Sequence, residues 1–374
     1  MKIRMPKIIV SVSNDLVTDQ RIKKVCRTLY DEGYDILLIG RQLPNSLPLE
    51  RPYRTHRFKL LFNKKVWFFA ELNIRLFFKL LTTKTDILLA NDLDTLLPNF
   101  LVSKIKGKKL VYDSHELFTE VPELQNRPWV KNTWLSIERF IFPKLKNVIT
   151  VNQVIADIYT EKYGVPVNVI RNITPKLHLK PIDKTWAESI KGGKKMLILQ
   201  GSGINKDRGA EEAVQMMSYL EHTLLVIIGG GDVFETLKQM RLDLALEDKI
   251  LILDKMPHDE LLQYTQIADL GLSLDKGSNL NYEYSLPNKI FDYIQCHVPL
   301  MVSNRKVVAK IIADNDIGVV FKSHDPKQMA EVVKTALNNE HDYQRWKTNL
   351  KKASETYRWE HEAKTLRYIY SHLK

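Results

Sequence analysis

The sequence predicts an α/β protein made of two doubly wound units, each a parallel sheet with helices packed on both faces. Three observations support this. Short apolar segments alternate with segments of helical periodicity along most of the chain. The alternation stops once, over residues 175–193, where Pro175, Pro181 and several lysines indicate a linker. The series then resumes, and 374 residues are enough for two domains with separate cores.

Composition limits the partners and the compartment. The chain has 56 lysines and arginines against 44 acidic residues, a net charge of +12, which suits nucleic acid, an anionic membrane or phosphorylated substrates. Neither a zinc-finger spacing nor an RNA-binding signature is present, so no nucleic-acid partner is expected. Cys26 and Cys296 do not suggest a disulfide framework. Without a signal peptide or an apolar run of 18 residues, we expect a cytoplasmic protein, or one peripheral to the inner face of the cytoplasmic membrane.

The first domain is expected over residues 1–174 and begins as a βαβ unit. A strand at 7–14, a helix at 20–32 and a strand at 35–40 follow one another, and Gly33 ends the helix. No Gly-x-Gly-x-x-Gly lies between strand and helix, which disfavours a dinucleotide-binding enzyme. Further strands are predicted at 86–92, 109–116, 147–152 and 167–172, with a helix at 129–145.

Residues 56–81 alternate basic and aromatic side chains, including Lys64, Lys65, Trp67, Phe68 and Phe78. A basic, aromatic amphipathic helix can lie in a membrane interface. The alternative is a helix packed on the sheet whose lysines extend outward to solvent. The sequence leaves both interpretations open.

Polar residues mark the ends of two strands in this domain. Asp92-Leu-Asp94 has the D-x-D pattern that can hold a divalent metal, but Asp94 is better explained as a helix N-cap, and no metal is predicted. Asp113-Ser-His-Glu116 lies at a carboxyl strand end, where ligands bind in open α/β sheets.

The second domain is expected over residues 194–355, followed by a helix within 356–374. Its strands are predicted at 196–203, 224–231, 250–254, 270–274, 300–303 and 318–321. Three of its loops meet at one sheet edge, and together they favour a nucleotide diphosphate. The candidate ligands in these loops are Gly201, Gly203, Lys206, Arg208, Gly229 to Gly231, Asn288, Lys289 and Asp292.

The last of these loops opens a short helix that is predicted to start at Pro287 and to stop before Pro299. Ile290, Phe291 and Ile294 form its expected buried stripe. Asn288, Lys289 and Asp292 are expected on the other side or at the end. Such a helix could instead be a capped amphipathic helix with a solvated charged face.

Several motifs resemble those of the group 1, or family 4, retaining glycosyltransferases, over essentially the whole chain. Ser285-Leu-Pro-Asn-Lys-Ile-Phe-Asp292 is similar to the family's donor-binding Pro-x-Lys-x-x-Glu helix. Asp207-Arg-Gly209 resembles its phosphate contact, Tyr112 to Glu116 its acceptor-domain strand end, and Thr18 to Arg21 its opening. The chain departs from the family in three places: its glutamate is Asp292, the partner acid falls at Tyr284 beside Glu283, and a glycine is replaced by His297.

The resemblance implies the GT-B fold, with two Rossmann-like domains facing across a cleft and a C-terminal helix crossing back to the first domain. It implies hexosyl transfer from a nucleotide sugar to a hydroxyl of a glycan or lipid-linked acceptor, with retention, in bacterial cell-surface polysaccharide or glycolipid synthesis. Neither cofactor nor metal is implied. Arg208 and Lys289 would offset the diphosphate charge, with Lys206 third, and Asp292 would accept from ribose hydroxyls.

The resemblance also assigns five residues of the first domain, one of them a histidine, to the acceptor side. His115 would contact the transferred sugar or the acceptor, or would simply be a satisfied histidine at a strand end. Asn14, Asp15, Asp19 and Glu116 would line the acceptor side, where the first three serve equally well as loop-forming and capping residues. Two alternatives stay open: a non-catalytic nucleotide-sugar-binding module, and a sugar-nucleotide epimerase that would use Asp113, His115 and Glu116.

Overall fold

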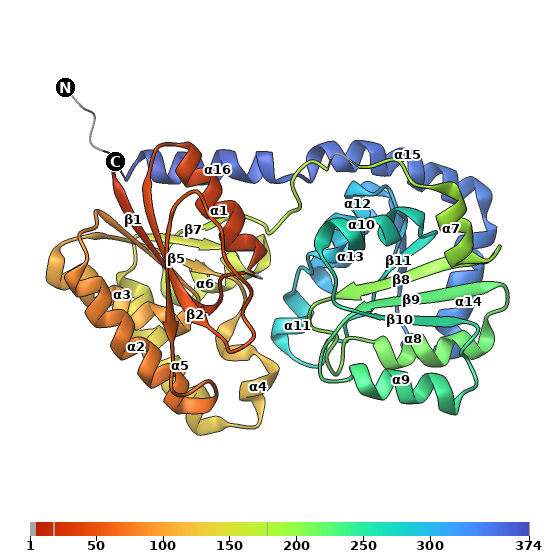
Figure 1. Ribbon diagram of the computed structural model, residues 1–374, viewed down its shortest axis with the longest axis horizontal. Coiled ribbons are helices and arrows are strands. Elements are labelled where there is room, and N and C mark those ends of the chain that lie inside the picture. The colour runs from red at the N-terminus through yellow and green to blue at the C-terminus, as the bar shows by residue number, and fades with distance from the viewer. Residues whose placement is uncertain (1–4, 18, 178, 374) are drawn as a thin grey trace. The chain divides into compact units, whose positions relative to one another are not determined.

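The computed structural model describes residues 5–17, 19–177 and 179–373, and it divides the chain into two compact units. Unit 1 takes the chain up to Asn172 and again from Glu360, and unit 2 runs from Ile173 to Trp359. Thr18, part of the resemblance at the start of the chain, lies outside the described residues. Both units are α/β (Figure 1).

Unit 1 is organised around a parallel sheet of seven strands in its described residues, in the order β3-β2-β1-β4-β5-β6-β7. The strands are β1 Lys7–Asp15, β2 Asp35–Gln42, β3 Arg54–Lys59, β4 Ile87–Asn91, β5 Lys109–Ser114, β6 Asn147–Thr150 and β7 Val167–Val169. The order reverses between β1 and β4, and the crevice beyond such a switch point is where ligands bind in open α/β sheets.

The helices of unit 1 are α1 Gln20–Asp31, α2 Lys65–Thr82, α3 Leu93–Lys106, α4 Pro122–Gln125, α5 Pro128–Ile141, α6 Gln153–Tyr163 and α16 Trp359–Ser371. The prediction of one amphipathic element over residues 56–81 is wrong in its first part, because this stretch begins within β3 and the helix starts only at Lys65. Phe68, Leu72, Leu76 and Leu80 of α2 are buried against the sheet, as the packed-helix interpretation expects.

The C-terminal helix α16 packs on unit 1, beside α1 (Figure 1). The hydroxyl of Tyr34 donates to the carbonyl of Tyr370 at 2.9 Å, and the two rings meet edge to face. Glu362 accepts from the backbone and the guanidinium of Arg171. The helix thus returns the chain from unit 2 to the first domain, as predicted.

Unit 2 repeats the architecture with six parallel strands in the described chain, ordered β10-β9-β8-β11-β12-β13. They are β8 Lys195–Gly201, β9 Thr223–Gly229, β10 Ile250–Asp254, β11 Leu270–Ser273, β12 Leu300–Ser303 and β13 Gly318–Phe321. The switch point lies between β8 and β11, so the loops after these two strands are the expected place for a ligand.

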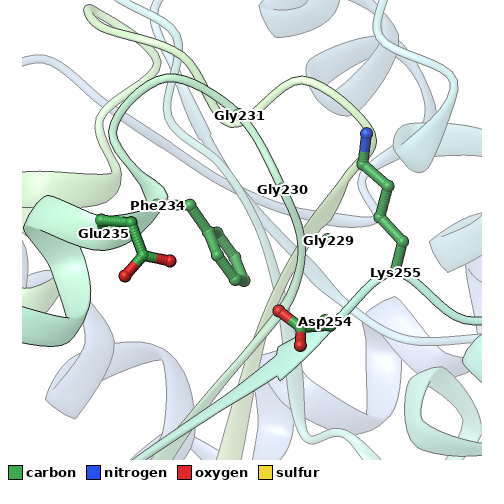
Figure 2. Close-up of a pocket in the computed structure, with 7 residues that line it drawn as sticks. All are labelled: Gly229, Gly230, Gly231, Phe234, Glu235, Asp254 and Lys255. Carbon is green, nitrogen blue, oxygen red and sulfur yellow. The ribbon is translucent and has the colours of Figure 1, made fainter.

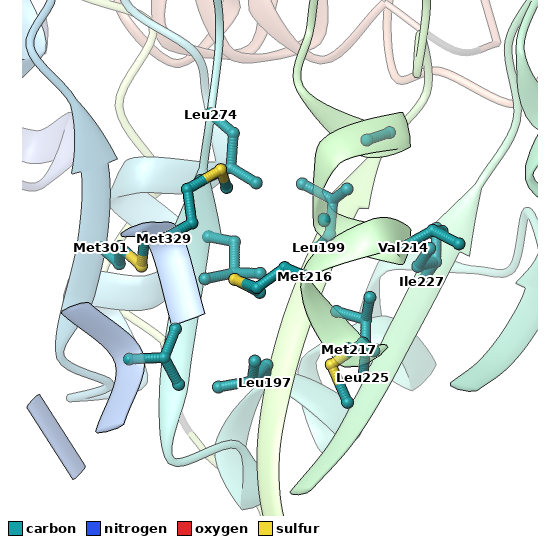
Figure 3. Close-up of a cluster of buried hydrophobic side chains, with 14 of the residues drawn as sticks. Leu197, Leu199, Val214, Met216, Met217, Leu225, Ile227, Leu274, Met301 and Met329 are labelled. Atoms are coloured by element: carbon teal, nitrogen blue, oxygen red, sulfur yellow. The ribbon is translucent and has the colours of Figure 1, made fainter. Parts of the chain in front are cut away.

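The helices of unit 2 are α7 Lys184–Lys191, α8 Ala210–Met216, α9 Phe234–Asp243, α10 His258–Ile267, α11 Leu280–Tyr284, α12 Lys289–Gln295, α13 Lys306–Asn315, α14 Pro326–Asn338 and α15 Glu340–Thr356. Figure 3 shows one core layer, in which Met216 at the end of α8 and the next residue, Met217, pack with strand residues such as Leu197 and Leu225. Burial of these unbranched side chains lets the layer close without voids.

Residues 175–193, assigned to a linker from the sequence, lie in unit 2 and include α7. Asp183 caps this helix by accepting from the backbone of Thr185 and Trp186, and Gly192 ends it in a left-handed conformation. Trp186 and Ile190 pack against the core, so a helix of two turns lies within the segment that looked aperiodic.

Candidate functional site

The loops after β8 and β9 in unit 2 are held together at glycines. A Cβ on Gly229 would come within 1.8 Å of the Gly201 carbonyl oxygen, and one on Gly231 within 2.2 Å of the Ile204 oxygen. Only glycine fits these two positions, because any side chain would push the loops apart. By contrast, a Cβ on Gly201 or Gly203 would meet nothing closer than 3.7 Å. A Cβ at either of these two positions would therefore make only ordinary van der Waals contacts.

A shallow pocket of about 400 Å³ lies in front of the second glycine turn. Figure 2 shows Phe234 and Glu235 on one side of Gly230, with Asp254 below and Lys255 on the other side. The pocket opens at the carboxyl ends of β9 and β10, so it lies at the edge where the sequence predicted a nucleotide. Gly230 was predicted, whereas Phe234, Asp254 and Lys255 were not.

Of the two predicted diphosphate ligands, Arg208 forms an ion pair with Asp275, and Lys289 lies within the electrostatic influence of both of these residues. Arg208 Nη1 is 3.1 Å from Asp275 Oδ1, and the guanidinium carbon lies 4.5 Å from the centre of the Tyr282 ring. Asp275 is 3% exposed and its Oδ2 accepts no hydrogen bond from the described residues. Two cations therefore face one buried anion, which leaves positive charge for a ligand to neutralise.

Burial lowers the pKa of the Lys289 ammonium, and the neighbouring Arg208 lowers it further, while Asp275 acts in the opposite direction. In the described chain this ammonium forms no hydrogen bond or ion pair. An anion placed next to it would favour the charged form. The site is thus electrostatically suited to a phosphate.

The other predicted donor-side residues lie on the surrounding loops. Asn288 is exposed and is the N-cap residue of α12. It lies one residue after Pro287, where the helix was predicted to start. Lys206 is exposed, and its backbone N–H donates to Asp232 Oδ1 at 2.9 Å. Asp232 in turn accepts nothing from the side chain of Lys206, so the loop is fixed by backbone contacts and the ammonium stays in solvent.

Asp292 is not on an exposed face of α12, as the periodicity suggested, but is 7% exposed. Its Oδ1 accepts from the hydroxyl of Thr174 at 2.7 Å, and its Oδ2 accepts from Gln200 Nε2 at 3.1 Å. His258 Nε2 lies 3.2 Å from Oδ1. Every residue from Ile290 to Gln295 is buried, because α12 packs against the sheet on one side and against α10 and α15 on others.

Replacing Asp292 with asparagine is expected to destabilise unit 2 by about 1–3 kcal/mol, the cost of leaving a buried polar group without its partner. The new amide would keep one acceptor oxygen and place an N–H donor against either the Thr174 hydroxyl or the Gln200 amide. Chemical denaturation measures the loss, and Asp325→Asn, at an exposed helix cap, is the control. Equal stability of Asp292→Asn and the wild type would contradict this assignment.

Ion pairs and hydrogen bonds link the polar residues at the strand ends of unit 1. Arg21 on α1 makes a bidentate ion pair with Asp113 of β5, at 3.0 and 2.7 Å, and both are almost fully buried. His115 Nδ1 lies 3.0 Å from Asp92 Oδ2, and its Nε2 lies 3.2 Å from Asn91 Oδ1. Burial favours neutral His115, but Asp92 and Asp113 outweigh it and raise the pKa of the imidazole well above its usual range. His115 is therefore a fixed imidazolium at the sheet edge.

Asp94 does not cap α3, contrary to the sequence prediction. Asp92 occupies the N-cap position with a positive φ of 58°, and Asp94 is turned into the first helical turn, where it is 5% exposed. Burial, and then repulsion from Asp92, raise the pKa of Asp94 to about 7. Within the described ranges, no group of three or more His, Cys, Asp or Glu side chains is placed to hold a metal ion.

The residues predicted on the acceptor side lie near the carboxyl end of β1 and after β5. Asp19 caps α1 by accepting from Ile22 N at 3.0 Å, and Asn14 donates to Asp19 at 3.2 Å. Asp15 accepts from Val17 N and from the Ser46 hydroxyl. Glu116 is half-buried beyond β5. The capping and loop-forming functions that the sequence offered as alternatives are thus present.

Besides the pocket residues Phe234, Asp254 and Lys255, the partners in two ion pairs were missed, because a lone residue carries no motif. Asp275 follows β11, and only the sheet order shows that it faces Arg208. Arg21 appeared only as part of the resemblance at the start of the chain, without an expected partner. Its pairing depends on how β5 lies relative to α1, which no local pattern encodes. A search for charged residues one or two positions after each predicted strand would have found Asp275.

Comparisons with known proteins agree with this geometry. A family model described as glycosyl transferases group 1 matches residues 182–353, and one described as glycosyltransferase family 4 matches residues 19–174. No curated protein sequence gave a match.

The solved structures similar to this chain share its fold from end to end. Sucrose-phosphate synthase from Thermosynechococcus elongatus has a TM-score of 0.82 at 16% identity, with 99% of each chain covered. HepE from Anabaena, in complex with UDP, has a TM-score of 0.75 at 13% identity and covers 98% of this chain and 100% of its own. WaaG, a glycosyltransferase involved in lipopolysaccharide biosynthesis, has a TM-score of 0.66 at 13% identity, covering 97% and 99%.

At these identities the solved structures establish the fold alone, which is GT-B. The two family models add the sequence relationship and lie end to end along most of the chain. Together they show that the chain belongs to the group 1, family 4 glycosyltransferases.

Proposed function

We propose that this glycosyltransferase moves a hexosyl group from a nucleotide-diphosphate sugar to a hydroxyl of a glycan or lipid-linked acceptor, with retention and without a metal ion. The observation that carries the proposal is the Arg208–Asp275 ion pair, with the Lys289 ammonium close enough to be affected electrostatically by both residues. A diphosphate would supply the anion that these two cations lack.

In this proposal the cation pair does the electrostatic work of the reaction. As the bond between the anomeric carbon and the diphosphate oxygen breaks, negative charge grows on the leaving group. Arg208 is already fixed by Asp275 and by the Tyr282 ring, so it needs little reorganisation to stabilise that charge. Its planar guanidinium suits two phosphate oxygens, while Lys289 adds a point charge.

The nucleoside is assigned to the pocket in front of Gly229 to Gly231, which opens at the same sheet edge. HepE was solved with UDP and with UDP-glucose, which supports a uridine nucleotide as the first donor to test. The resemblance assigned Asp292 to the ribose. Its oxygens already accept hydrogen bonds inside unit 2, so we assign it instead to positioning α12, which carries Lys289.

For the acceptor, we propose the polar edge of unit 1, where His115, Asp15 and Glu116 lie at strand ends. Both ring nitrogens of His115 already contact acceptors of unit 1, so its positive charge, rather than a hydrogen bond, would act on a bound sugar or acceptor. The similarity to WaaG supports a cell-surface glycan or glycolipid, made at the inner face of the cytoplasmic membrane.

The test is release of nucleoside diphosphate from a panel of UDP-, GDP- and ADP-sugars, measured with wild type and Arg208→Ala in the presence of glycan and lipid acceptors. We expect wild-type release with one nucleotide class, and product bearing the same anomeric configuration as the donor. Activity should persist in the presence of a metal chelator. Release by Arg208→Ala at the wild-type rate would overturn the assignment of the cation pair.

A second candidate, a non-catalytic nucleotide-sugar-binding module, is favoured by one observation. The acid nearest to the missing family glutamate, Glu283, is bound to Arg305 and to the backbone of Lys306, beside Tyr284. Such a module would bind the nucleotide but would turn over none of the donor sugars. Calorimetric binding combined with the release assay separates the two candidates.

Donor binding is expected to weaken as the pH rises above neutral. Only the protonated Lys289 attracts the diphosphate, and burial already lowers the pKa of its ammonium. Affinity should therefore be constant below that pKa and should fall as the pH rises through it. Calorimetry with UDP across the alkaline range measures the effect. Lys289→Arg, which stays charged, should bind without this decline.

A further inference from the structure

Unit 1 exposes large apolar side chains on three of its helices, which we call the apolar face. Its members are Trp67, Ile74 and Phe78 of α2, Leu101 and Ile105 of α3, and Phe140 of α5. Their exposed fractions run from 40% for Leu101 to 65% for Trp67. Single exposed apolar residues are ordinary, but a set on adjoining helices marks an interaction surface.

Helix α2 carries apolar residues on two sides. Phe68, Leu72, Leu76 and Leu80 recur every four residues and bury one side in the core. Trp67, Ile74 and Phe78, at spacings of seven and four, form a second stripe that faces solvent. The inner stripe accounts for packing on the sheet, so packing does not explain the outer one.

Contacts between apolar side chains link the three helices that carry the face. A groove of about 280 Å³ lies between α2 and α3, with Ile74, Phe77 and Phe78 on one side and Leu97, Pro98 and Leu101 on the other. On the far side of α3, Phe100 meets Phe140 of α5 edge to face, with ring centres 6.2 Å apart.

Basic residues dominate the segments that carry the face. Residues 61–82, 97–108 and 127–146 contain twelve lysines and arginines against two acids, Glu71 and Glu138. Glu71 pairs with Arg75 at 2.7 Å. Glu138 is buried and pairs with Lys162 at 2.8 Å. Both acids are thus paired with cations. Lys131 and Lys108 are themselves paired with Glu120 and Asp86 from neighbouring segments, and the remaining lysines and arginines leave a positive excess around the apolar face.

We propose that the apolar face docks unit 1 on the surface of an anionic lipid bilayer. Tryptophan and phenylalanine ringed by lysine and arginine suit the boundary between acyl chains and anionic headgroups. Protein interfaces, by contrast, are depleted of lysine. None of the described helices meets the length and apolarity needed to cross a bilayer. The proposed contact is with the surface of the bilayer.

This docking extends the sequence hypothesis for residues 56–81 to α3 and α5. It also requires no catalysis, and it can be tested apart from the proposed glycosyl transfer. Long lysine and arginine side chains at the edge would reach the headgroups while their methylene stems cover apolar surface. Insertion of the exposed stripe would remove its side chains from water, and attraction to anionic lipid would fall as salt screens it.

The experiment is flotation of the full chain with vesicles of phosphatidylcholine alone, or of phosphatidylcholine mixed with an equal part of phosphatidylglycerol. We expect binding to the mixed vesicles at low salt, at least tenfold weaker binding at high salt, and little binding to phosphatidylcholine alone. The double variant Phe78→Ser, Ile105→Ser and, separately, Lys104→Glu with Arg139→Glu should each reduce binding at least tenfold.

Matched controls come from unit 2. Leu242→Ser removes an equally exposed apolar side chain, and Lys352→Glu reverses an exposed charge. Both should float like the wild type, and all variants should keep wild-type melting and UDP binding. Absence of binding to mixed vesicles at low salt would overturn the proposal. So would equal binding of the Phe78→Ser, Ile105→Ser variant, or self-association through the face in lipid-free light scattering.

Discussion

Replacing Arg208 with alanine is expected to weaken binding of the nucleoside diphosphate about ten- to a hundredfold, because a charge-assisted hydrogen bond contributes about 1.5–3 kcal/mol. If transfer occurs, its rate should fall further, by about a hundredfold or more, since the cation also stabilises charge that develops on the leaving group. Isothermal calorimetry with UDP measures the first effect, and nucleotide release measures the second.

The change also removes the partner of buried Asp275, so binding must be separated from stability. Asp275 is 3% exposed and Arg208 is its only ion-pair partner in the described chain. Arg208→Lys keeps a charge near Asp275 but loses the planar fork, and should lie between wild type and Arg208→Ala in affinity. Arg208→Ala combined with Asp275→Ala removes the unpaired carboxylate as well. Weak UDP binding by a double variant that melts like the wild type would locate the effect in the ligand site.

An Arg208→Ala protein that is folded and binds UDP as tightly as the wild type would contradict the assignment. A half-buried arginine at the end of α9 in the same unit, Arg241, provides the reference for general loss of positive charge. Its guanidinium contacts only the Glu247 carbonyl, at 3.1 Å. Arg241→Ala should therefore leave UDP affinity within about twofold of the wild type, as for surface changes of about 0.5 kcal/mol or less.

The strands of both sheets were predictable because parallel strands buried on both faces are continuous apolar runs. Strand β9, Thr-Leu-Leu-Val-Ile-Ile-Gly, is an example in which every residue is buried. Strand β3, Arg-Thr-His-Arg-Phe-Lys, was missed because it lies at the sheet edge and only Phe58 is buried. Its basic and aromatic residues continue into α2, so the sequence looked like one amphipathic segment.

Only part of the candidate site could be read from the sequence. Arg208 and Lys289 belong to local motifs, and the structure pairs Arg208 with Asp275 and places Lys289 within the electrostatic influence of that carboxylate. Asp275 itself has no motif, and its place depends on β11 lying beside β8. Helical periodicity placed Asp292 on an open face. A charged residue enters a core only where partners such as Thr174 and Gln200 are supplied by distant segments, and periodicity cannot show them.

The largest effect on stability is expected from Arg21→Met in unit 1. Arg21 and Asp113 are 3% and 2% exposed, and a third guanidinium contact reaches the Ile170 carbonyl at 2.7 Å. Removing one partner of a buried ion pair leaves an uncompensated charge, which costs about 3–5 kcal/mol. The loss should appear in unit 1, as faster hydrogen exchange in α1 and β5 with little change in the strands of unit 2.

The same helix offers a matched control. Arg27 pairs with Asp31 at 2.9 Å, but the two side chains are 61% and 47% exposed. Arg27→Met should therefore cost no more than about 0.5 kcal/mol. Equal losses for Arg21→Met and Arg27→Met would show that burial does not set the strength of this pair. Arg21→Met combined with Asp113→Leu removes both charges, and should recover part of the loss because no buried charge is left unpaired.

The pH dependence of this pair follows from its electrostatics. Burial acts to raise the pKa of Asp113, but Arg21 and His115 outweigh it and hold that pKa well below its usual range. A depressed pKa in the folded state contributes stability above the unfolded pKa, and the contribution is lost as pH falls through the folded pKa. In Arg21→Met, the arginine no longer opposes the rise that burial causes in the pKa of Asp113. Asp113 should therefore take up a proton at higher pH than in the wild type. The stability difference between the two proteins should then narrow as the solution is acidified, whereas the small difference for Arg27→Met should stay nearly constant. A gap for Arg21→Met that is independent of pH would mean that the lost stability is packing of the arginine side chain rather than its charge.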